Sequence, residues 1–174
     1  MTVDEAKYTP RLKGPLFLMA VLCLLSMTTE IIAQEPPPRP ITVTVTQNLG
    51  FGAFTLGVTG GTVSIDPSSI RASTGDVLLL NLGYLYSAAS YRLVGNPGTV
   101  VSILNGSDVS LAGSGGGSLL LHIGSSNPPS PFVISTVPPN YTVMTVGGVL
   151  TVGNTASNPP GSYSGTFNIT FVQE

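Results

Sequence analysis

Alternating apolar and polar residues dominate the chain after about residue 40. In the stretch ITVTVTQ at residues 41–47, Ile41, Val43 and Val45 face one side of an extended strand and the threonines face the other. The closing stretch SYSGTFNITFVQ at residues 162–173 alternates in the same way, with aromatic and aliphatic side chains at most odd positions. Both patterns predict β-strands with one face turned toward a core.

Turn-forming residues separate the other apolar runs at short intervals. Asp66-Pro67, Asn96-Pro97-Gly98 and Asn105-Gly106 each follow a run rich in Val, Ile or Leu, and Gly147-Gly148 predicts a tight turn between two further strands. Outside an apolar segment near the N-terminus, no stretch keeps a helical period. We therefore expect an all-β fold, an antiparallel immunoglobulin-like β-sandwich of about nine or ten strands.

Three glycine-rich runs, GFGAF, GVTGG and GSGGG, lie inside this strand pattern. A phosphate-binding loop would need a following Lys-Ser or Lys-Thr and a helix, and none is present. These runs are predicted to form turns and bulges, and GSGGG is predicted to join two strands of the stretch at residues 108–124.

The N-terminal segment has the organisation of a secretory signal peptide. Lys7, Arg11 and Lys13 precede the apolar run LFLMAVLCLLSM, which is too short for a membrane span of about 20 residues, and Ala33 supplies a small residue for cleavage. An uncleaved anchor is the alternative, because Ile31 is a poor match to the small residue preferred there. We expect residues 1–33 to be removed, leaving no stable membrane span.

The remaining chain divides into two parts. Residues 34–40, QEPPPRP, are rich in proline and predict an extended linker, whereas residues 41–174 predict the β-sandwich domain. The exported protein is expected in the periplasm, at the outer cell surface or outside the cell.

Composition narrows the possible functions of the exported chain. Cleavage removes the single cysteine, Cys23, and every lysine, so disulfides and thiolate sites are not expected. The three remaining arginines cannot supply the basic patch that binding to nucleic acid requires. Only 8% of the whole chain is charged, which also argues against helices stabilised by charge pairs.

No residue set predicts a catalytic or metal centre, and we expect no cofactor. His122 is the only histidine, and the chain has no G-x-S-x-G motif to supply a nucleophile beside it. One histidine and scattered aspartates do not form a zinc site, and no calcium-binding loop is present. His122 is therefore predicted to be a strand residue at the outer face or rim.

Three long segments carry a family resemblance. They are QNLGFGAFTLGVTGGTVSIDPSSIRASTGDVLLL, ASYRLVGNPGTVVSIL and VGGVLTVGNTASNPPGSYSGTFNITFVQ, and together they resemble the bacterial secreted family catalogued as domain of unknown function 4402. The resemblance implies an extracytoplasmic compartment and supplies no activity. The closing motif, with Gly161, Tyr163, Gly165 and Thr166, is similar to the last strand of chaperone-usher pilins and spore-coat-U-like subunits, which implies a pilin-like sandwich. The chain lacks the cysteine pair often seen in those subunits.

These observations favour an exported, non-enzymatic structural or adhesive surface protein. Its first strand, with Ile41, Val43 and Val45, could complete a neighbouring copy or another surface subunit by strand donation, giving a fimbria-like homopolymer. The alternative is a self-complete monomer whose first strand stays in its own sheet. One alternative is a module that binds a polysaccharide or another surface polymer through stacking aromatics. The candidates for this stacking are Tyr84, Tyr86, Tyr91 and Tyr141. A hydrolase that uses His122 is a further alternative.

Overall fold

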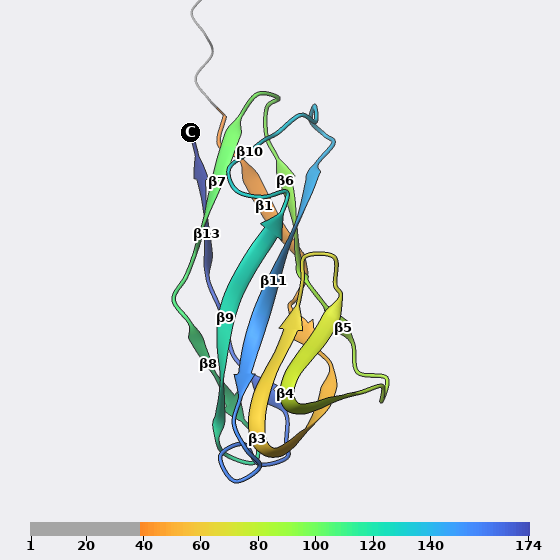
Figure 1. Ribbon diagram of the computed structural model, residues 1–174. Helices are drawn as coiled ribbons and strands as arrows, with labels where there is room; N and C mark the ends of the chain where they lie inside the picture. The colour runs from red at the N-terminus through yellow and green to blue at the C-terminus, as the bar shows by residue number, and fades with distance from the viewer. Residues whose placement is uncertain (1–38) are drawn as a thin grey trace, which may run out of the picture. The chain divides into compact units, whose positions relative to one another are not determined.

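The computed structural model describes residues 39–174, so the predicted signal peptide and all but the end of the predicted linker lie outside the described residues. The described part is all-β, with antiparallel strands that form a β-sandwich (Figure 1). Within residues 39–174, no helix is long and apolar enough to cross a membrane. The predicted fold class is confirmed.

Thirteen strands form three sheets in residues 39–174. The strands are β1 (Thr42–Gln47), β2 (Gly50–Phe51), β3 (Ala53–Ile65), β4 (Arg71–Leu80), β5 (Tyr86–Ser87), β6 (Ala89–Val94), β7 (Val100–Asn105), β8 (Val109–Gly113), β9 (Ser118–Asn127), β10 (Phe132–Val133), β11 (Thr142–Val152), β12 (Tyr163–Ser164) and β13 (Ile169–Gln173). The largest sheet has the order β1-β6-β11-β9-β8-β12, with β3 paired to β11 and β4 paired to β3. A second sheet has the order β10-β7-β13, and β2 pairs with β5.

The strand count exceeds the expected nine or ten because four of the thirteen strands have only two residues: β2, β5, β10 and β12. Such short pairings form where the chain passes from one sheet to another, and two residues are too few to show alternation. The other nine strands have five residues or more. Sequence periodicity therefore detects the long strands and misses the short ones.

The predicted turn at Gly147-Gly148 is wrong, because β11 runs through both glycines without a break. On one edge, β11 pairs with β6 at residues 142–146 and with β3 at residues 148–152, while β9 lies along its other edge. A Cβ atom on Gly147 would collide with the carbonyl oxygen of Ile65. The glycines thus allow close backbone approach where β11 changes partner.

The predictions for the GSGGG and GVTGG runs are confirmed. The GSGGG run is the turn between β8 and β9, which pair from Ala112 and Ser118 onward, and Gly116 and Gly117 have positive φ angles. The GVTGG run forms a bulge in β3, where the register with β4 shifts between Leu56 and Gly61. Asp76 supports this bulge by accepting a hydrogen bond from the backbone N–H of Val58 at 2.7 Å.

The core lies between the sheets and follows the alternation of the strands. In β9, Leu119, Leu121 and Ile123 are buried, while Leu120 and His122 point outward. The closing segment also turns its odd-numbered apolar side chains toward the core, as the sequence predicts. Those side chains, however, are only partly buried, and two of them, Tyr163 and Phe167, line the candidate site described below.

Candidate functional site

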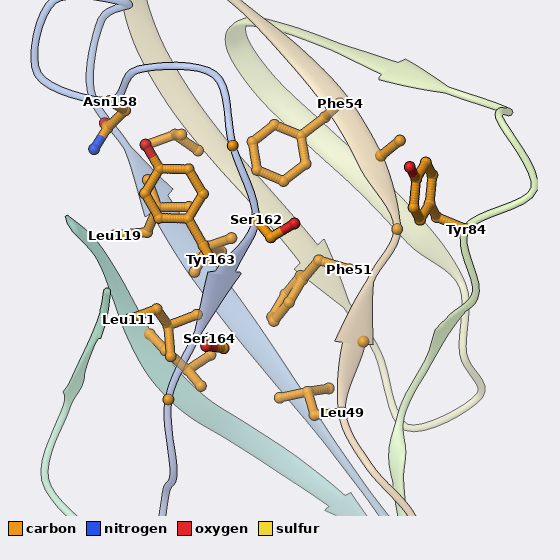
Figure 2. A pocket seen from close by; sticks show the side chains of 18 of the residues that line it. Leu49, Phe51, Phe54, Tyr84, Leu111, Leu119, Asn158, Ser162, Tyr163 and Ser164 are labelled. Carbon is orange, nitrogen blue, oxygen red and sulfur yellow. The ribbon is translucent and has the colours of Figure 1, made fainter. Parts of the chain in front are cut away.

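A large groove lined by uncharged residues opens into the core between two segments that are far apart in the sequence. One wall is formed by residues 48–56 and the other by residues 158–167, and the volume between them is about 1140 Å³. Figure 2 shows Leu49, Phe51 and Phe54 on the first wall, across from the segment that carries Ser162, Tyr163 and Ser164 on the second. We call this feature the seam groove.

Arg71 holds the first wall in place. Its guanidinium donates hydrogen bonds to the carbonyl oxygens of Phe51, Ala53 and Leu80 at 3.1, 3.2 and 3.1 Å. Gly52 has a φ of 68°, and a Cβ atom there would lie 2.5 Å from the Arg71 side chain. Glycine is therefore required where the chain bends around the guanidinium.

The second wall is anchored by two polar side chains. Asn158 is buried, accepts a hydrogen bond from the Gly153 N–H at 2.6 Å and donates one to the Ser118 carbonyl at 2.7 Å. The Tyr163 hydroxyl donates to the Pro159 carbonyl at 2.7 Å. These bonds satisfy the buried polar atoms of this wall, which also presents serine and threonine side chains to the groove.

The floor of the groove consists of core side chains. They are Tyr91, Leu111, Leu119, Leu121, Leu150 and Val152. In the part of the chain that the structure describes, no charged residue lines the groove, and Tyr91 meets Phe171 edge to face with ring centroids 5.5 Å apart. Burial raises the pKa of the Tyr91 phenol, because the charged phenolate loses its hydration there. The groove carries no charge and combines apolar side chains with hydroxyl and amide groups, so it suits an uncharged occupant of mixed character.

A free strand edge borders the second wall. Ser162, Asn168 and Glu174 form backbone hydrogen bonds toward the β7–β8 side. Because bonding direction alternates along an antiparallel strand, the odd-numbered residues between them, such as Ile169 and Phe171, direct their backbone N–H and C=O groups to the opposite edge. Within residues 39–174, that edge has no backbone partner.

At the end of β13, the Gln173 side chain spans the gap between this strand and the chain that enters β1. Its Oε1 accepts a hydrogen bond from the Ile41 N–H at 3.0 Å, and its Nε2 donates to the Arg39 carbonyl at 3.1 Å. β1 itself pairs with β6, with Val43 opposite Leu93. Ile41 and Val43 are half-buried and Val45 is exposed, so β1 is a lightly held edge strand.

The predicted stacking tyrosines do not lie on one element. Tyr84 is in the exposed loop between β4 and β5, Tyr86 is in β5, and Tyr141 comes directly before β11. Tyr91 is 7% exposed and belongs to the groove floor, so its ring offers no outer face to a polymer. Tyr86 and Tyr141 are each covered by an arginine, Arg71 at 4.3 Å and Arg92 at 4.4 Å.

His122 lies on the outer side of β9, and its Nδ1 is 2.7 Å from a carboxylate oxygen of Asp108. Both side chains are largely exposed, and no serine forms a hydrogen bond with His122 among the described residues. Residues 39–174 also contain no group of three or more histidine, cysteine or acidic side chains arranged to hold a metal ion.

Sequence reasoning missed the groove and the roles of Arg71, Asn158 and Gln173. The run GFGAF carried a partial signal, since glycine can adopt the positive φ that Gly52 has where this wall bends. Nothing local, however, indicates that this run faces residues 158–167, because that approach is set by pairings distant in sequence.

Comparison with known proteins identifies the family of the β-sandwich domain. Residues 41–172 match the family described as Domain of unknown function (DUF4402), and this match covers nearly all of the described β-sandwich. No curated protein and no solved structure matches the chain. The chain therefore belongs to the DUF4402 family.

Proposed function

We propose that this protein is an exported, non-enzymatic structural or adhesive surface protein whose seam groove accepts an extended uncharged segment from a neighbouring subunit. The observation that carries the proposal is the uncharged groove beside the free edge of the closing segment. Backbone groups at this edge can pair with an incoming strand, and the groove can take its alternate side chains.

The groove is better suited to a polypeptide than to a small apolar ligand. Its volume of about 1140 Å³ exceeds the range of about 300–1,000 Å³ that is usual for small-molecule sites. A small apolar ligand would also leave the backbone groups of the free edge without partners, whereas a β-strand satisfies them. Strand addition therefore uses both features of the site.

Export is supported by the order of basic residues, apolar run and Ala33 at the N-terminus. The mature protein is expected to begin at Gln34 and to occur in the periplasm, at the outer surface or outside the cell. N-terminal sequencing of exported material checks this expectation, and material that still contains Cys23 would contradict it.

A peptide with the sequence of residues 41–47, ITVTVTQ, is a suitable probe of the groove because it is uncharged and alternates. In the full chain the β6 edge is already covered by β1, so the groove beside the closing segment is the proposed binding site. We expect saturable binding of the labelled peptide, and we expect Ser162→Trp, which fills the groove, to weaken it about tenfold or more.

Ser125→Trp is the matched control, because Ser125 is exposed on β9 and does not line the groove. It should leave the affinity for the peptide unchanged. Equal binding to both tryptophan variants, or no binding to the unmodified chain, would contradict the proposed strand-accepting groove.

A further inference from the structure

One buried polar group of the seam groove has no hydrogen-bond partner. Tyr91 on the groove floor is 7% exposed, and its hydroxyl forms no hydrogen bond with any group in residues 39–174. The other polar side chains of the lining that are buried or half-buried, Asn158 and Tyr163, are bonded to backbone groups. A tyrosine as deeply buried as Tyr91 normally has a partner for its hydroxyl.

The Tyr91 hydroxyl reaches the space of the groove. No fully enclosed side-chain oxygen or nitrogen in the described part of the chain lacks a hydrogen bond, so this oxygen is not sealed inside the core. The groove that Tyr91 lines gives it access to water. Ser162, Ser164 and Thr166 on the second wall are exposed and keep contact with bulk solvent. An occupant that displaces water from Tyr91 must therefore replace that hydrogen bond.

Tyr91 lies below the path of an added strand. It is opposite Val45 of β1, and its ring meets the Phe171 ring of the closing segment edge to face. The backbone groups of Phe171 belong to the free edge. A strand that pairs with this edge lies about 4.8 Å from the closing segment and directs every second side chain toward the core. One of these inward side chains then lies next to Tyr91.

We propose that Tyr91 selects the strand that the seam groove accepts. In that strand the inward side chain next to the Tyr91 hydroxyl is polar and uncharged (threonine, serine, asparagine or glutamine), and the other inward side chains are apolar. The inference rests on the proposed function, and it adds the chemistry of the partner strand. Elsewhere the floor consists of leucine and valine side chains, against which a polar group would lose its hydration without gaining a hydrogen bond.

The absence of charge in the groove excludes an acidic partner for Tyr91. No charged residue lines the groove in residues 39–174, so a carboxylate would leave water with no cation to offset the cost. Valine has nearly the shape of threonine, but it leaves the Tyr91 hydroxyl unpaired. One hydrogen bond therefore distinguishes threonine from valine at this position, with almost no change of shape.

Exchange of threonine and aliphatic residues in the ITVTVTQ peptide measures this preference. Each peptide is titrated against the full chain and against the full chain with Tyr91→Phe. The peptides carry one exchange each: Ile41→Thr, Thr42→Val, Val43→Thr, Thr44→Val, Val45→Thr or Thr46→Val. At one position we expect threonine to bind about three- to tenfold more tightly than the aliphatic residue, and we expect Tyr91→Phe to remove this preference.

Tyr141→Phe is the matched control, because Tyr141 is exposed before β11 and does not line the groove. It should keep the preference for threonine. If the peptide binds and Ser162→Trp weakens it, but Tyr91→Phe changes the preference at none of the six positions, the groove accepts strands and the inference about Tyr91 is wrong. If the peptide does not bind, the proposed function and the inference are both wrong.

Thermal unfolding of the free chain at neutral pH gives a second measurement, which needs no ligand. Tyr91→Phe removes a hydroxyl that bonds nothing within the described chain and keeps the ring that meets Phe171, so the midpoint should not fall. Tyr163→Phe loses the bond to the Pro159 carbonyl and should lower the midpoint by several degrees. An equal fall in both variants would show that the Tyr91 hydroxyl already has a partner in the chain, and it would overturn the inference.

Discussion

β11 and the closing segment of residues 163–173 both direct apolar side chains toward the core, yet they have different surroundings. β11 has strands along both edges, and Met144, Val146 and Leu150 are buried. The closing segment is paired on one edge only, and Ile169 and Phe171 stay half-buried. Alternation decides which side chains face inward, and in the closing segment the unpaired edge leaves those side chains only partly covered.

The largest expected effect comes from comparing one substitution in the closed core with one in the wall of the seam groove. Leu93→Ala removes a fully buried side chain from β6 and should lower the free energy of unfolding by about 2–5 kcal/mol. Leu49→Ala removes a half-buried side chain from the groove wall and should cost about 1 kcal/mol. Denaturant unfolding measures both values. An equal loss in the free energy of unfolding for both variants would show that the wall of the seam groove is packed as closely as the core.

Arg71→Ala tests whether one side chain maintains the first wall. Loss of the hydrogen bonds to Phe51, Ala53 and Leu80 should lower the free energy of unfolding by about 1.5–3 kcal/mol. Arg71→Lys should recover little of this loss, because an ammonium group lacks the planar fork. Faster amide exchange in the short β2–β5 pair should accompany both substitutions, because Arg71 holds the Phe51 carbonyl and lies against the Tyr86 ring. Unchanged exchange would show that this pair is held by other contacts.

Tyr91 allows a test by pH, since its folded pKa is raised by burial while its unfolded pKa stays near 10. The stabilising contribution of the neutral phenol is complete below the unfolded pKa and is lost as pH rises toward the folded pKa. The free energy of unfolding should therefore decline above about pH 10. The decline should be smaller in Tyr91→Phe, measured by denaturant titration across this range. An identical decline in both proteins would remove Tyr91 as its cause.

The smallest expected effect concerns the hydrogen bonds that the Gln173 side chain makes at the end of β13. Gln173→Ala removes the two hydrogen bonds to Ile41 and Arg39 and should cost about 0.5–1.5 kcal/mol. Amide exchange of Ile41 should accelerate, while exchange of Leu93 in β6 should not change. Unchanged protection of Ile41 would show that pairing with β6 alone holds the start of β1.

The fold class and the inward faces of the strands could be predicted because periodicity is local. Ile41 and Val43 face the core, as do Tyr163 and Phe167, and GSGGG is a turn. Gly147-Gly148 misled the prediction, because a glycine pair suits both a tight turn and a close backbone approach. The groove was unpredictable for another reason: it depends on which segments become neighbours, and no short stretch of sequence encodes that choice.

The continuous strand through Gly147 and Gly148 also constrains the order of folding. β3, β6 and β9 are all made before β11, yet each pairs along it. The large sheet therefore cannot be completed until residues 142–152 emerge, when most of the chain has already been synthesised. These pairings close long loops, which gives the protein a high contact order and slow folding. Until then, the earlier strands expose the edges and apolar faces that β11 later covers.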